Sequence, residues 1–216
     1  MIKKELSFQN KRNRIGIMGG TFDPIHMGHL ILAEKAYEQL ALDQIWFMPS
    51  GNPPHKRNRL GRATDEQRVE MVRRGISGND HFSLSLIEMH ENGYTYTYHT
   101  LEELKEKNPD TDYFFIIGAD SLFQFDTWME PERICAACTL VVATRNHTST
   151  EKICAKMEEV RQAYHGKLLR LDTMNIDVSS QMLREWISEG KSIRYYVPDS
   201  VIDYIREQKM YQDLRS

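Results

Sequence analysis

Short apolar runs alternate along this chain with longer stretches in which apolar residues recur every three or four positions. The short runs have the length of β-strands, whereas the periodic stretches are typical of helices that bury one face. The pattern predicts strands at 15–18, 44–48, 112–119, 138–144 and 167–171, with a weaker strand at 81–88. It predicts helices at 28–40, 65–76, 96–107, 150–165, 179–190 and 198–211. Apolar strands separated by helices indicate an α/β fold, in which a doubly wound parallel sheet is covered on both faces.

The chain carries no internal repeat, low-complexity segment or linker that would divide its 216 residues. We therefore expect a single domain over 1–216 with a C-terminal helical end, and an N-terminal extension at 1–13.

The charged side chains nearly balance, with 28 basic against 31 acidic residues and a net charge of −3. This balance argues against nucleic acid or an anionic membrane as a partner held by overall charge. No apolar run reaches transmembrane length, and the first 14 residues lack the apolar core of a signal peptide. Three cysteines, an odd number, argue against a secreted disulfide framework. We expect a cytoplasmic protein. Its oligomeric state is not determined by these features, and a homo-oligomer is compatible with them.

The stretch "GIMGGTFDPIHMGHL" joins the first predicted strand to the first predicted helix. It contains neither a P-loop nor the G-x-G-x-x-G fingerprint. Gly19 and Gly20 allow the backbone to bend and expose its N–H groups. His26 and His29, three positions apart, flank Gly28 and face the same side of the first helical turn. Together with the helix N-terminus, these groups predict a site for an anionic ligand, and Gly28 leaves room for it.

Two other interpretations of the histidine pair remain open. The rings could bind zinc, but zinc takes a third protein ligand and only Asp23 is near in sequence. They could also cap the helix without any further function.

The stretch "GGTFDPIHMGH" resembles the H-x-G-H signature of the nucleotidyltransferase superfamily, a Rossmann-like group that transfers nucleotidyl units. The segments "NPPHK", "GYTYTYHTL", "GADSLFQFDTW" and "DVSSQMLR" follow in the order of the bacterial nicotinate-mononucleotide adenylyltransferases. The resemblance covers 14–205. It implies that the chain transfers the adenylyl group of ATP to nicotinate mononucleotide, which gives deamido-NAD and pyrophosphate. Relatives with another acceptor, such as nicotinamide mononucleotide or phosphopantetheine, and a non-catalytic nucleotide sensor are the alternatives.

Adenylyl transfer is an in-line attack of a phosphate oxygen on the α-phosphorus of ATP, and it depends on positioning and charge neutralisation. His26 and His29 are expected to hold the ATP phosphates, with His29 stabilising the α-phosphate. Lys56 and Arg184 supply permanent positive charge for the triphosphate and the leaving pyrophosphate. A divalent ion, Mg²⁺, is expected to bridge the phosphates and to be coordinated mostly by water and substrate, so no protein metal site is expected.

The resemblance also assigns residues to the two substrates. The residues expected at ATP are Gly19, Gly20, Thr21, Phe22, Gly28, Gly118, Asp120, Ser179 and Ser180. Those expected at nicotinate mononucleotide are Thr97, Trp128, Met129 and Arg145. Three of these have simpler interpretations, as an N-cap for Asp120, a core residue for Trp128 and a solvated cation for Arg145.

The chain departs from the family pattern on the acceptor side. His99 stands where an acidic residue is usual, and Met129 stands where tyrosine is common. These departures leave pyridine specificity open. Cys135 and Cys138 form a C-x-x-C, which we interpret as two buried free thiols because no second pair accompanies it.

Overall fold

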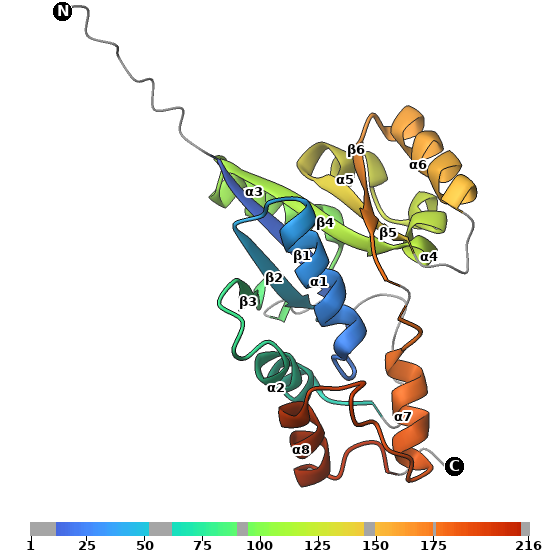
Figure 1. The fold of residues 1–216 in the computed structure, drawn as a ribbon. Coiled ribbons are helices and arrows are strands. Elements are labelled where there is room, and N and C mark those ends of the chain that lie inside the picture. The colour runs from blue at the N-terminus through green and yellow to red at the C-terminus, as the bar shows by residue number, and fades with distance from the viewer. Residues whose placement is uncertain (1–11, 52–61, 90–94, 145–149, 175, 213–216) are drawn as a thin grey trace, which may run out of the picture.

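The computed structural model describes residues 12–51, 62–89, 95–144, 150–174 and 176–212. Within these ranges six parallel strands form one sheet in the order β3-β2-β1-β4-β5-β6 (Figure 1). The order reverses between β1 and β4, which is the point where doubly wound sheets bind ligands beyond the carboxyl ends of their strands. The strands are β1 (Asn13–Gly20), β2 (Gln44–Pro49), β3 (Phe82–Leu84), β4 (Thr111–Gly118), β5 (Thr139–Thr144) and β6 (Lys167–Asp172).

Helices connect and cover the strands, which confirms the predicted α/β doubly wound fold. They are α1 (Met27–Gln39), α2 (Asp65–Gly75), α3 (Thr97–Lys107), α4 (Ala119–Phe123), α5 (Pro131–Ala137), α6 (Thr150–Tyr164), α7 (Ser180–Ser188) and α8 (Asp199–Glu207). Two 3₁₀ turns, η1 (Ile87–Met89) and η2 (Phe125–Thr127), complete the described elements.

The sequence pattern differs from the structure in a few short elements. The weak strand predicted at 81–88 is reduced to the three residues of β3, and η1 follows it. Helices α4 and α5 have five and seven residues, which is too short for a helical period to show in the sequence. Strand β1 begins at Asn13, inside the predicted N-terminal extension, and residues 1–11 lie outside the described part.

Both faces of the sheet are buried, which explains the continuous apolar character of its strands. In β4, Phe114 and Ile116 belong to one core cluster, which also contains residues of α1, α2, α7 and α8. Phe115 and Ile117 point to the other face and join a cluster with residues of α3, α4, α5 and α6.

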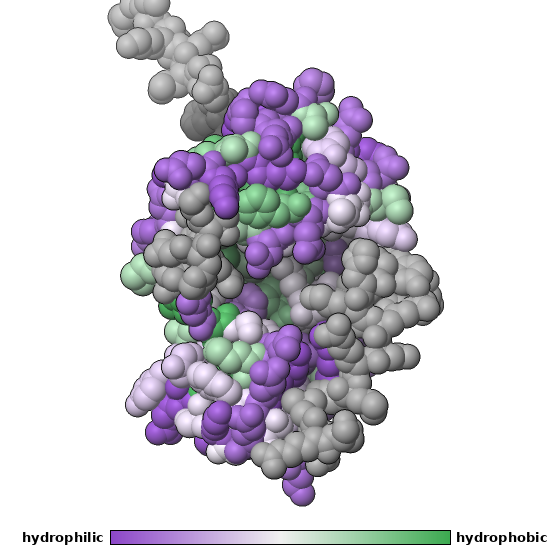
Figure 2. Space-filling view, turned by 90° about the vertical axis from the view of Figure 1, so that its right-hand side faces the viewer, coloured by the Kyte–Doolittle hydropathy of each residue, from purple (hydrophilic) through white to green (hydrophobic). Residues whose placement is uncertain are grey.

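Helices α2, α7 and α8 lie together beyond one edge of the sheet, so the predicted helical C-terminal end is confirmed (Figure 1). Figure 2 shows that the molecular surface is hollowed between this helical part and the part that contains the sheet. None of the described helices is long and apolar enough to cross a membrane.

Candidate active site

Two glycine-containing strand ends lie side by side at the point where the strand order reverses. Met18 of β1 pairs with Ile116 of β4, and both strands continue for two more residues, to Gly20 and Gly118. A Cβ built on Gly118 would meet no atom within 4 Å, whereas one on Gly20 would lie 3.3 Å from the ring of Phe22. The end of β4 therefore borders open space, as the binding of a substrate there would require.

The turn after β1 is held rigidly by side chains from the core. Phe22 adopts a left-handed backbone conformation with φ of 48°, which is uncommon for a bulky residue. Its ring is buried and packs at 5.0 Å from the ring of His29 and at 5.8 Å from that of Phe47. The carbonyl of Thr21 accepts a hydrogen bond from Arg68 Nη1 at 2.9 Å. A strained residue fixed in this way is typical of a binding site that is formed before its ligand arrives.

His26 and His29 stack on each other at the start of α1. Their ring centroids are 3.7 Å apart, and His26, the N-cap residue, is only 2% exposed. The Nδ1 atom of His29 accepts a hydrogen bond from the backbone N–H of His26 at 3.3 Å. An accepting Nδ1 carries no proton, so the neutral ring carries its proton on Nε2, and Nε2 is the donor. The capping interpretation is therefore correct for His29 Nδ1, and it is compatible with a phosphate at Nε2.

Gly28 packs closely against two neighbouring side chains. A Cβ on Gly28 would lie 2.9 Å from Val178 Cγ1 and 3.0 Å from His26 Nδ1. Val178 and His26 thus lie close to Gly28 on one side, and Gly28 also lines an apolar crevice at the start of α1. Glycine at this position lets the segment before α7 pack closely against the first turn of α1.

The N-terminus of α7 meets the N-terminus of α1. Ser179 caps α7, as predicted, because its Oγ accepts from the N–H of Met182 at 3.2 Å. Ser180 Oγ donates to the carbonyl of Pro24 at 2.9 Å, in the loop before α1. Arg184 donates through Nη1 to the carbonyl of Asp23 at 2.5 Å. The partial positive charges of two helix N-termini and one guanidinium are thus brought to the same place, which favours an anion.

Sequence reasoning missed three residues that support this turn, namely Asp23, Arg68 and Tyr211. Asp23 is 1% exposed, and its Oδ1 accepts from the Tyr211 hydroxyl at 2.7 Å. Arg68, 5% exposed, also donates to the carbonyl of Ser50 at 2.8 Å, so it joins the ends of β1 and β2. The described residues contain no group of three side chains suited to a metal ion, so the zinc interpretation gains no third ligand there. Of these three residues, only Asp23 could be noticed in the sequence, because it lies in the glycine-rich turn beside the histidines.

The described residues expected at the acceptor lie at the start of α3 and directly after η2. Thr97 is the first residue of α3, and Met129 is 51% exposed. Trp128 is half-buried, with its ring 6.2 Å from that of Phe115 in an edge contact, so its core interpretation is partly correct. Asp120 does not cap α4, because the N-cap is Gly118; the carboxylate is exposed in the first helical turn. Lys56 and Arg145 lie outside the described residues.

An apolar crevice adjoins the start of α1. It is lined by Gly28, Ile31, Leu32, Ala143, Thr173, Met174 and Ile176. Met174, at its rim, is 73% exposed. The crevice is small, about 20 Å³, and its lining is mostly apolar.

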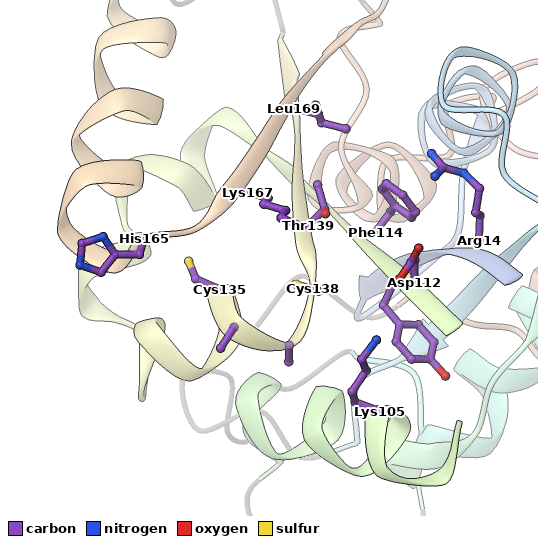
Figure 3. A pocket seen from close by; sticks show the side chains of 13 residues that line it. Arg14, Lys105, Asp112, Phe114, Cys135, Cys138, Thr139, His165, Lys167 and Leu169 are labelled. Carbon is purple, nitrogen blue, oxygen red and sulfur yellow. The ribbon is translucent and has the colours of Figure 1, made fainter. Parts of the chain in front are cut away.

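A cavity of about 540 Å³ lies at the opposite, amino-terminal edge of the sheet (Figure 3). Its lining includes Arg14 and Lys105, and it contains none of the site residues expected from the sequence. Arg14 and Lys105 are bound within the protein, because Lys105 Nζ donates to the carbonyl of Thr111 at 2.7 Å and Arg14 Nη2 to that of Leu40 at 3.0 Å, whereas Lys167, which also lines the cavity, is exposed.

The C-x-x-C cysteines also line the cavity at the amino-terminal edge. Cys135 and Cys138 are buried and free, as predicted. Burial raises the pKa of the Cys135 thiol to about 11, so it is protonated at neutral pH.

Comparisons with known proteins agree with this geometry. The model of the cytidylyltransferase-like family matches residues 17–186. A protein of Lachnoclostridium phytofermentans named "Probable nicotinate-nucleotide adenylyltransferase" is 44% identical over 199 residues, which cover 92% of this chain and 98% of that protein. A protein of the same name from Clostridium botulinum (strain Alaska E43) is 39% identical, covering 93% and 98%.

A solved structure shares the fold. It is Plasmodium falciparum nicotinic acid mononucleotide adenylyltransferase complexed with NaAD, with a TM-score of 0.75, 23% identity, and coverage of 92% of this chain and 97% of that one. The same enzyme complexed with APC superimposes with a TM-score of 0.72 at the same identity and coverage.

Proposed function

The chain belongs to the cytidylyltransferase-like family and, within it, to the nicotinate-nucleotide adenylyltransferases, and from this premise we propose which residues carry the reaction. The reaction transfers the adenylyl group of ATP to nicotinate mononucleotide and releases deamido-NAD and pyrophosphate, a step of NAD biosynthesis. The observation that supports the residue assignment best is the meeting of the N-termini of α1 and α7, with His26, His29 and Arg184, beside the open end of β4.

The phosphates of ATP bind at this junction in our proposal. The backbone of Gly19, Gly20, Thr21 and Phe22 lies beneath them, and Ser179 and Ser180 lie at the start of α7. His29 Nε2–H donates to the α-phosphate, where negative charge develops as the acceptor oxygen attacks. Arg184 neutralises the leaving pyrophosphate, and Lys56 is assigned the same task from the sequence alone.

The two ends of the forming dinucleotide bind on either side of the phosphates. Gly118 and Asp120, at the end of β4, are proposed at the adenosine, with Asp120 as its hydrogen-bond partner. On the acceptor side the pyridine ring lies against Trp128. The backbone N–H groups of Thr97 and Met129 face its carboxylate, with Arg145 at the nucleotide phosphate.

Mg²⁺ enters with ATP in this proposal. Asp23 and Asp120 are the carboxylates that follow the glycine-rich turn and the end of β4 most closely in the sequence. Asp23 is buried and accepts from Tyr211, so it is not available as a ligand, whereas Asp120 is exposed. The ion is therefore held mainly by phosphate oxygens and water, and it supplies charge neutralisation of the triphosphate.

Pyrophosphate release tests the choice of acceptor. Nicotinate mononucleotide has a carboxylate where nicotinamide mononucleotide has an amide, and two N–H donors suit a carboxylate because the amide NH₂ cannot accept. Leaving one buried donor unpaired costs about 1–3 kcal/mol, so we expect a preference of roughly tenfold or more in kcat/KM for nicotinate mononucleotide. Equal use of both mononucleotides would show that His99 and Met129 have changed the acceptor pocket. A reaction without mononucleotide is the blank.

A further inference from the structure

A buried carboxylate connects the glycine-rich turn with the C-terminal end of the chain. Oδ1 of Asp23 accepts from the Tyr211 hydroxyl at 2.7 Å and from the backbone N–H of Ala63 at 3.2 Å. Asp23 is 1% exposed and Tyr211 5%, so their contact is shielded from water. The two residues are 188 positions apart in the sequence.

The same aspartate holds Arg184, the cation proposed at the triphosphate. Nη1 of Arg184 donates to the carbonyl of Asp23 at 2.5 Å and lies 3.6 Å from Asp23 Oδ2. The contacts of Arg184 with other described residues use Nη1, which leaves Nη2 and Nε as donors for a phosphate. The backbone carbonyl of Asp23 holds Arg184 by a hydrogen bond, and its carboxylate adds an ion pair, so the position of the carboxylate influences where the remaining guanidinium donors point.

Tyr211 is well suited to fix that orientation. Burial raises the pKa of its hydroxyl, and the negative charge of Asp23 raises it further, so the group keeps its proton and remains a donor. The hydroxyl oxygen also lies 3.7 Å from Met71 Sδ, which places the end of the chain against α2. Without the hydroxyl, Oδ1 would retain only the N–H of Ala63 among these donors. A buried carboxylate that loses a donor turns toward its remaining partners, and here one of them is Arg184.

We propose that Tyr211 is a positioning residue for adenylyl transfer: by holding one oxygen of Asp23, it sets the position in which Arg184 meets the phosphates of ATP. This inference rests on the proposed function only in taking ATP as the nucleotide bound at this site.

The first test replaces Tyr211 by phenylalanine, which keeps the ring and removes the hydroxyl. A charge-assisted hydrogen bond contributes a factor of roughly ten or more, so Tyr211→Phe weakens ATP binding, measured by calorimetry without mononucleotide, by about tenfold. The kcat/KM for ATP falls by the same factor, while the KM for nicotinate mononucleotide stays within about twofold. An unchanged affinity for ATP would overturn the proposal.

The matched control is Tyr113→Phe. Tyr113 is 2% exposed, and its hydroxyl donates to the carbonyl of Leu104 at 3.2 Å, near the amino end of β4 and away from the site. This variant also loses a buried hydroxyl, but it keeps the affinity for ATP within about twofold. If Tyr113→Phe weakens ATP binding as much as Tyr211→Phe does, the effect comes from general loss of stability and the proposal is wrong.

A double-mutant cycle shows whether Tyr211 acts through Arg184. In an Arg184→Gln background, Tyr211→Phe changes ATP affinity by less than about twofold, because the cation that it positions is gone. Independent, multiplicative losses would overturn the proposal. Should Tyr211→Phe fail to fold, Asp23→Asn replaces it in the cycle, and its effect on ATP affinity is measured in the wild type and in Arg184→Gln. Absence of pyrophosphate release by the wild type with every mononucleotide would contradict the proposed function, whereas the ATP calorimetry would still decide the role of Tyr211.

Discussion

The two edges of the sheet both carry cations and open space, yet only one is arranged for an anion. At the carboxyl edge α1 and α7 begin, and the partial positive charge of their N-termini adds to that of Arg184. At the amino edge α1 ends, and its C-cap carbonyl, that of Leu40, takes the Arg14 guanidinium. Lys105 is likewise bound to a strand carbonyl. In our proposal arginine thus binds a ligand at one edge and stabilises the fold at the other, according to the direction of the neighbouring helices.

Replacing a histidine is expected to affect kcat very differently at the two edges, and this is the largest difference that we predict. His29→Ala removes the donor that we propose for the α-phosphate, and loss of one such preorganised donor lowers kcat by roughly 10²–10³. His165, which lines the cavity at the amino edge, is the matched position, and His165→Ala should leave kcat within about twofold. Steady-state rates of pyrophosphate release, with circular dichroism to confirm folding, measure both. A folded His29→Ala protein with normal turnover would remove His29 from the chemistry.

Replacing a cation, Arg184 at the carboxyl edge or Lys105 at the amino edge, is expected to give a smaller difference in kcat/KM for ATP. Hydrogen bonds to charged groups contribute about 1.5–3 kcal/mol, so Arg184→Gln should lower kcat/KM for ATP by roughly 10- to 100-fold. The KM for nicotinate mononucleotide should change little. Lys105→Gln, at the amino edge, should alter neither parameter. Because Arg184 also balances buried Asp23, Arg184→Lys is the companion variant that keeps the charge. Equal losses for both substrates would contradict the division of labour between the two sides of the site.

Features that depend on the local pattern of apolar residues, such as the strands and their carboxyl ends, could be predicted from the sequence. Strands buried on both faces are apolar throughout, and the residues at their carboxyl ends can be read directly after each run. His26 and His29 were proposed from the stretch after the first strand, whereas Arg184, which lies within α7, was proposed from the family resemblance. Helices α4 and α5 were missed because they are shorter than the pattern that reveals a helix.

Contacts between distant residues could not be predicted from local pattern. The hydrogen bond from Tyr211 to Asp23 spans 188 positions, and Arg68 looks like an ordinary polar residue of an amphipathic helix until the fold places it under the turn. The close contact of Gly28 with Val178 likewise depends on tertiary structure and could not be read from the local pattern.

Alanine substitutions of Gly118 and Gly16 give a third comparison, because one should lower activity and the other should lower stability. A Cβ at Gly118 meets no protein atom, so Gly118→Ala should leave the free energy of unfolding within about 0.5 kcal/mol. Because the methyl group would enter the substrate space, kcat/KM should fall by roughly tenfold. A Cβ at Gly16 would lie 2.4 Å from Ile45 Cδ1, so Gly16→Ala should cost about 1–3 kcal/mol through overpacking and leave the turnover of the folded enzyme unchanged. Urea unfolding and initial rates separate the two outcomes. A stable, fully active Gly118→Ala protein would mean that no substrate approaches the end of β4.

The smallest effect is expected for the thiols, although Cys135 and Cys138 line a cavity. A thiol reacts with iodoacetamide as its thiolate, and a pKa of about 11 at Cys135 leaves roughly a thousandth of it ionised at pH 8. Burial raises the pKa of Cys138 as well, and both side chains are shielded, whereas Cys154 is exposed on α6. Mass spectrometry of the native protein should therefore show one carbamidomethyl group, at Cys154, and unchanged pyrophosphate release. Rapid modification of Cys135 would show that the cavity opens to solvent more widely than the structure has it. Loss of activity after that modification would show that the amino edge is coupled to the site, and the separation of the two edges would then be wrong.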